Sequence, residues 1–151
     1  MKISSVVIAV AIAILAVSLW ALANRPDEEP PWPDRIQGFS FSPFQSGQDP
    51  LARIYPSESQ IEVDLALLRG KTHAIRTYSV EDVLVKIPEL ARKHDINVAF
   101  GVWIDADVER NQADMQRFLE TTVKNTNIVR AMVGNEVLLR QEQPAAALIA
   151  M

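Results

Sequence analysis

The sequence predicts an α/β fold in which a parallel sheet follows an N-terminal apolar segment. Short apolar runs typical of strands alternate with helical patterns in the order βαβαβαβ, and this order requires parallel strands joined by helical crossovers. Within the run 96–103, Val98, Phe100 and Val102 share one face, while small residues share the other face with Trp103. Bulky residues against helices and small residues opposite them suit the inside of a closed barrel. An open doubly wound sheet fits the same element order.

The first 24 residues are predicted to be a signal anchor or a signal peptide. Residues 6–23 form an uncharged run of eighteen residues, a length near the lower limit for crossing a hydrocarbon core of about 30 Å. Lys2 precedes this run and acidic residues follow it, which places the N-terminus in the cytoplasm and exports the rest. Ala21-Leu22-Ala23 fits a cleavage site, whereas Trp20 fits an interfacial anchor. Contact with a membrane is expected through residues 3–23.

A linker and a series of alternating elements follow. Residues 25–35 contain four prolines and several acidic residues, which favours an extended spacer between the apolar segment and a domain at 36–151. A capping box of Ser57 and Gln60 marks a helix start, and Pro88 is expected to kink or shorten the next helix. The predicted strands are 36–42, 73–78, 96–103 and 127–134; the predicted helices are 57–70, 79–94 and 111–125, with another starting at Glu136.

The composition excludes several classes of function. The chain has 151 residues and a formal net charge of -4, without the dense basic patch that nucleic-acid binding needs. It contains no cysteine, so disulfides, thiolate metal sites and a thiol nucleophile are excluded. His73 and His94 are far apart and lack ligand spacing. We therefore expect no metal, no cofactor and no nucleic-acid partner.

Aromatic, amide and carboxylate side chains are predicted at the carboxyl ends of the strands, where such folds gather their active sites. They are Phe41, Phe44, Tyr78, Trp103, Asp105, Asn135 and Glu136. Rings stack on sugar C–H faces and polar groups pair with sugar hydroxyls, so the set suits a carbohydrate. Gly134 would let the strand break step so that Asn135 and Glu136 both face the site. Each residue also has a simpler explanation. Glu136 can interact favourably with a helix dipole, and the aromatic residues can belong to the hydrophobic core. Arg76 and Arg140 can be surface charges or members of ion pairs.

The segments GFSFSPF, IRTYS, GVWI and VGNEVLLR occur in this order on successive strands. Together they resemble the family 17 glycoside hydrolases, most closely the membrane-associated bacterial exo-β-1,3-glucanases or β-1,3-glucosyltransferases. The resemblance covers residues 36 to about 145. It implies a (β/α)8 TIM barrel, of which residues 36–151 supply the first four βα units, and retaining chemistry on β-glucan. It also implies a place in the inner membrane facing the periplasm, or in the periplasm or medium after signal cleavage.

The resemblance carries roles to single positions. Glu136 matches the catalytic acid/base, Asn135 the amide that precedes it, and Tyr78 the active-site tyrosine. Trp103 falls where a substrate-lining residue is usual; Arg76 and Phe41 are further expected substrate-binding residues. The acid/base role requires Glu136 to project into the same cleft as Tyr78 and Trp103.

One part of the family pattern is missing. A retaining site needs a second carboxylate about 5–5.5 Å from the first, and the family places it near the end of a seventh strand. Residues 36–151 contain four predicted strands, so we expect a truncated enzyme with little or no activity by itself. The alternative is a non-catalytic exported glucan-binding or assembly module, in which a half-barrel self-associates through its open edges.

Overall fold

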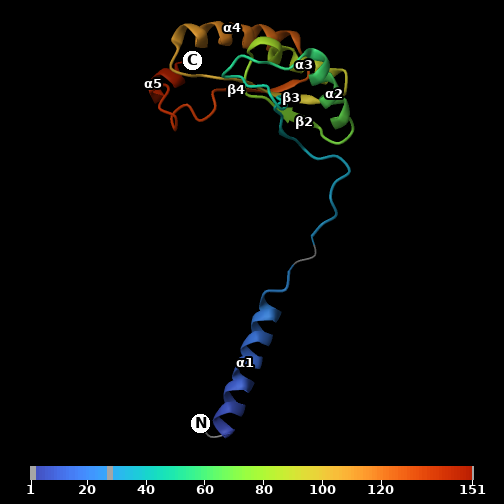
Figure 1. The fold of residues 1–151 in the computed structure, drawn as a ribbon, viewed down its shortest axis with the longest axis vertical. Coiled ribbons are helices and arrows are strands. Elements are labelled where there is room, and N and C mark those ends of the chain that lie inside the picture. Colours follow the sequence, from blue (N-terminus) through green and yellow to red (C-terminus); the bar gives the residue numbers. More distant parts are fainter. Residues whose placement is uncertain (1–2, 27–28, 151) are drawn as a thin grey trace. The chain divides into compact units, whose positions relative to one another are not determined.

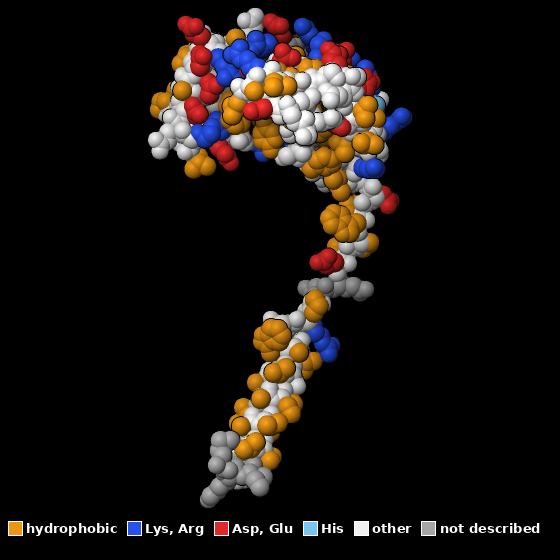
Figure 2. Space-filling model, viewed as in Figure 1, with side chains coloured by type: hydrophobic (Ala, Val, Ile, Leu, Met, Phe, Trp, Pro, Cys, Tyr) orange, Lys and Arg blue, Asp and Glu red, His pale blue; other side chains and the backbone are white. Residues whose placement is uncertain are grey.

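The computed structural model describes residues 3–26 and 29–150, in two units that divide between Trp32 and Pro33. The first unit contains α1 (Ile3–Ala23), shown in Figure 1, whose surface is almost wholly apolar (Figure 2). Its segment Ser4–Ala23 is long and apolar enough to cross a membrane, which is consistent with a signal sequence or an anchor. Lys2 and linker residues 27–28 lie outside the described residues.

The second unit is built on a four-stranded parallel sheet (Figure 1), which confirms the predicted parallel arrangement. The strands lie in chain order: β1 (Phe39–Ser40), β2 (Ala74–Arg76), β3 (Asn97–Val102) and β4 (Ile128–Val133). Each is shorter than its predicted run. The first strand is the shortest, because only one further ladder bond, from Phe41 N to Arg76 O at 2.9 Å, forms before Pro43, which has no N–H to donate.

One predicted helix start is confirmed, and the next predicted helix is divided in two. In α2 (Glu58–Leu68), Ser57 Oγ accepts from Gln60 N at 3.2 Å and Gln60 Oε1 accepts from Ser57 N at 2.8 Å, so the predicted capping box is confirmed. The single helix expected over 79–94 is instead a 3-10 helix η1 (Asp82–Lys86) followed by α3 (Ile87–Arg92). Pro88 lies in the first turn of α3, where its missing N–H leaves no helical bond unmade.

The next helix, α4 (Val108–Lys124), starts three residues before the predicted 111. The residue before this helix, Asp107, is an N-cap. Its side chain accepts from Arg110 N at 3.0 Å and caps α4. A short helix, α5 (Ala145–Ile149), follows β4.

One hydrophobic core joins the helices to one face of the sheet. Val98, Phe100 and Val102 are buried on that face, as the alternation of residue sizes predicts, and the ring centroids of Phe100 and Phe118 lie 5.2 Å apart. The core also includes Ile61 and Leu65 of α2 and Leu90 and Ala91 of α3. Because the described strands keep chain order, they show no reversal of the kind that a doubly wound sheet requires. The sheet has open edges at β1 and β4, so barrel closure is not observed.

Candidate active site

Six residues were given a predicted catalytic or substrate-binding role, and the carboxyl ends of the strands bring four of them together at one edge of the sheet. Arg76 is the last residue of β2, and Tyr78 lies two residues beyond it. Trp103 follows β3 directly, and Asn135 lies two residues beyond β4. All four residues are half-buried. Parallel strands end at a common edge, so residues far apart in sequence become neighbours there.

A hydrogen-bonded and stacked network joins β1, β2 and the loop after β4 at this edge. Arg76 Nη2 donates to Asn135 Oδ1 at 2.9 Å, and the guanidinium carbon of Arg76 lies 4.6 Å from the centroid of the Tyr78 ring. The Tyr78 hydroxyl lies 2.6 Å from Ser40 Oγ. Arg76 is therefore held by an amide and by an aromatic face. Its Nε is buried without a hydrogen-bond partner within the described residues.

Arg140 extends the network to Trp103, and sequence reasoning treated it only as a surface or paired charge. Its guanidinium carbon lies 4.0 Å from the centroid of the Trp103 ring. Its Nη2 donates to Ile104 O at 3.0 Å, and its Nη1 donates to Asn135 O. No pattern in the sequence pairs Arg140 with a ring 37 positions away, so this contact could be found only in the folded chain.

The backbone after β4 leaves the strand conformation sharply. Gly134 has φ +76° and Glu136 has φ +54°, so the alternation of side chains along the strand is interrupted where the sequence predicted a distortion. A Cβ at Gly134 would lie 2.5 Å from Val137 Cγ2, which leaves no room for a side chain. The helix expected to start at Glu136 is absent from the described structure: residues 137–141 form a single turn, with Arg140 N donating to Glu136 O at 2.9 Å. Because no helix starts at Glu136, a favourable interaction with a helix dipole cannot explain an acidic residue at this position.

Two predicted site residues lie outside the network. Phe41 is buried in the hydrophobic core at 8% exposure, so its ring is not open to a sugar in this structure. Glu136 is exposed, and its carboxylate has no hydrogen-bond or ion-pair partner in the described part of the chain. It lines a hollow of about 280 Å³ with apolar side chains, among them Val133, Val137 and Leu148. No hydrogen bond connects Glu136 to the other predicted site residues, so its place in a common cleft stays a prediction.

Comparison with known proteins identifies the family. Residues 38–151 match the family model described as the BtgE/BtgC glycoside hydrolase domain. The chain belongs to this family. Its relatives include the "Probable glucan endo-1,3-beta-glucosidase btgC" of Aspergillus flavus, 33% identical over 128 residues, and that of Aspergillus clavatus, 34% identical over 129 residues. These matches cover 79% and 80% of this chain but only 18% of each relative. No solved structure matches it.

A retaining mechanism needs two carboxylates, and two carboxylates close to the network are engaged in ion pairs. Glu142 Oε1 lies 3.5 Å from Arg140 Nε. Asp105 Oδ2 accepts from Arg110 Nη1 at 3.1 Å. Arg110 also pairs with Glu81 at 2.6 Å and approaches Asp114 at 3.8 Å. This cluster joins the loops after β2 and β3 to α4, so Asp105 contributes to loop structure. It therefore offers no free nucleophile.

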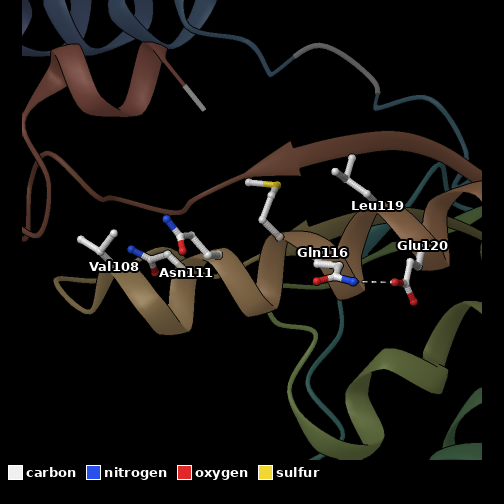
Figure 3. A pocket seen from close by; sticks show the side chains of 7 residues that line it. Val108, Asn111, Gln116, Leu119 and Glu120 are labelled. Carbon is white, nitrogen blue, oxygen red and sulfur yellow. Dashed lines mark hydrogen bonds between the residues drawn. The ribbon is translucent and has the colours of Figure 1, made fainter.

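A second hollow, of about 470 Å³, runs along α4 and is formed by that helix alone. Figure 3 shows Val108, Asn111, Gln116, Leu119 and Glu120 along its length, with Gln116 Nε2 donating to Glu120 Oε1 at 3.1 Å. The lining is mainly apolar. It contains one carboxylate and no aromatic ring, so it lacks the groups that a glucan site requires.

Proposed function

We propose that this glycoside hydrolase domain acts on β-1,3-glucan by a retaining mechanism, as a hydrolase or glucosyltransferase of the family 17 type. The names of its relatives support the linkage. The observation that carries the proposal is the network of Arg76, Tyr78 and Asn135, which lies beside the strand end that presents Glu136. An aromatic ring, an amide and a guanidinium supply the stacking surface and the hydrogen-bond donors that orient a sugar.

In this mechanism Glu136 protonates the departing glycosidic oxygen and then takes a proton from the incoming water or sugar hydroxyl. Asn135 donates to the 2-hydroxyl of the sugar, a bond that strengthens in the transition state. Its Oδ1 accepts from Arg76, which fixes the amide orientation and directs Nδ2 elsewhere. Nδ2 makes no hydrogen bond within the described residues, so this donor is available to substrate. Tyr78 and Trp103 contribute aromatic surface.

The four strands are proposed to form the first half of a (β/α)8 barrel. Their sequential order and the single core on one face support this architecture, because a barrel places all its helices outside. The opposite face, which carries Arg76 and Trp103, then becomes the barrel interior and its mouth. A second carboxylate would come from strands beyond these four. The chain alone is therefore expected to bind glucan and to turn it over weakly or not at all.

Incubation of the full chain, in detergent micelles, with laminari-oligosaccharides tests this proposal. The expected result is measurable binding with little turnover, and weaker binding by Tyr78→Ala. Turnover comparable to that of ordinary glycosidases would contradict the need for a second carboxylate. If a form of the domain is active, the lengths of its products distinguish the exo action implied by the sequence resemblance from the endo action named for the fungal relatives.

We further propose that α1 holds the domain at a membrane, on the exported side. Its apolar length supports an anchor, and a cleaved signal is distinguished from it by the N-terminal sequence of the mature protein. A mature chain that begins after Ala23 would exclude the anchor.

The second candidate function is a non-catalytic glucan-binding or assembly module that pairs through its open edges. Large apolar side chains at the β4 and α4 edge favour it: Leu119 is 56% exposed and Val123 86%, and Val129 on β4 is 55% exposed. Light scattering in detergent discriminates between the two functions. A dimer that binds glucan without cleaving it favours the module, whereas a monomer argues against it.

A further inference from the structure

We infer that Arg140 is a positioning residue that fixes the turn Gly134–Glu136 against the loop after β3, and so sets where Asn135 and Glu136 lie. This inference rests on the proposed function, which makes those two residues the reacting and orienting groups. Arg140 contacts two backbone carbonyl groups, an aromatic ring and, through Nε, the Glu142 carboxylate at 3.5 Å, all within the domain. It therefore acts through the turn and is not proposed to touch the sugar.

The contacts of Arg140 join two loops that are distant in sequence. One guanidinium nitrogen donates to the carbonyl oxygen of Asn135, within the turn, and the other donates to Ile104 O, at 3.0 Å, in the loop after β3. Gln143 makes a parallel link, with Nε2 donating to Asp105 O at 2.8 Å. The loop after β4 is thus attached to the loop after β3 at two points, and one of them is adjacent to Glu136.

The turn requires such an attachment because its backbone is strained. Glu136 has φ +54°, a left-handed conformation that is unfavourable for a residue with a side chain. Strained residues of this kind persist only where surrounding contacts hold them. Arg140 supplies a contact at the residue directly before Glu136, so its loss should let the turn relax.

Trp103 supports Arg140 in this arrangement. The guanidinium carbon lies 4.0 Å from the ring centroid, so one face of the indole is covered by Arg140. Only the remaining surface of Trp103 is open to a sugar. The ring therefore supports the guanidinium that donates to the two carbonyl groups, and this is a more specific role than a sugar platform alone.

Lysine cannot reproduce these contacts, and this provides the test. A guanidinium presents two separated donors and a flat face for stacking, whereas an ammonium presents one compact charge. Arg140→Lys keeps the charge and most of the aliphatic chain, so it removes the geometry with little other change. Arg117→Lys on α4 is the matched control, because Arg117 pairs with Asp114 and contacts neither loop.

The experiment is amide hydrogen exchange on the full chain in detergent micelles, combined with the ¹³C signal of the Glu136 carboxyl, which is assigned by its loss in Glu136→Gln. In Arg140→Lys, exchange of amides 134–141 should speed up at least about tenfold and the carboxyl signal should shift. Exchange in α2 and β3 should not change. Arg117→Lys should leave both the turn amides and the carboxyl signal as they are.

The outcomes separate the two proposals. Unchanged exchange of residues 134–141 and an unmoved Glu136 signal in Arg140→Lys would overturn the positioning role. Faster exchange throughout the domain would also overturn it, because Arg140 would then support the fold in general. If the turn loosens in Arg140→Lys but the unsubstituted chain also binds no laminari-oligosaccharide, the positioning role is supported and the proposed function is contradicted. A loosened turn with about tenfold weaker glucan binding would support both.

Discussion

Replacing Gly134 with alanine tests the backbone distortion that presents Glu136. Gly134 has φ +76°, and an added Cβ would lie 2.5 Å from Val137 Cγ2. Val137 is only 3% exposed, so it cannot move aside into solvent. The left-handed conformation costs alanine about 1–2 kcal/mol, and forcing a methyl group into a packed site costs about 1–3 kcal/mol more. The free energy of unfolding should therefore fall by about 2–5 kcal/mol.

Gly70→Ala is the matched control for this substitution. Gly70 has φ +74°, but no atom lies within 4 Å of the Cβ that alanine would add. The control therefore carries only the conformational cost of about 1–2 kcal/mol. Urea unfolding of the full chain, followed by circular dichroism, measures both variants. A loss at Gly134 no larger than the loss at Gly70 would refute the claim that the turn is closely packed against Val137.

Three further predictions concern charge and packing. Glu136→Gln should leave the free energy of unfolding unchanged, because Glu136 is exposed, yet it should abolish turnover in any active form of the domain; activity that survives would exclude the acid/base role. Phe118→Ala should lower the free energy of unfolding by about 3–5 kcal/mol, because its ring stacks on Phe100 in the core, and urea unfolding that shows a loss below about 1 kcal/mol would contradict that packing. Burial raises the pKa of the Asp114 carboxyl, and the hydrogen bond from Arg117 opposes this shift. The folded chain then holds this proton more tightly than the unfolded chain, so the contribution of Asp114 to stability falls as the pH rises above 3.8. Urea unfolding at several pH values measures the free energy of unfolding as a function of pH. Asp114→Asn should make this dependence flatter above pH 3.8, and the same pH dependence in both chains would contradict the raised pKa of Asp114.

Local chemistry made several elements predictable from the sequence. The capping box of Ser57 and Gln60 needs only residues three apart, and it forms as expected. The alternation of large and small residues in β3 predicted which face is buried, since Val98 and Phe100 are both at 0% exposure. Arg76 and Asn135 were each expected to bind substrate, and the hydrogen bond between them, which was not predicted, forms because parallel strands share a carboxyl edge.

Contacts between distant segments could not be predicted in the same way. The stacking of Arg140 on Trp103 depends on how two loops lie in space, and neither loop has a regular pattern. Phe41 was expected at the site because it lies near the end of the predicted strand 36–42. Alternation along the strand instead puts its ring on the same side as Phe39, and both rings pack in the core. The helix expected after Glu136 stops after one turn, because Gln141 takes φ +58° and Pro144 follows.

Titration of the full chain with laminari-oligosaccharide, followed by NMR, tests most directly whether the strand-end network binds β-1,3-glucan. We expect saturable shifts for side-chain signals of Arg76, Tyr78 and Asn135, and their loss in Tyr78→Ala. Signals from the hollow along α4 should not move. Shifts confined to α4, or no shift at the network at millimolar sugar, would contradict the proposal.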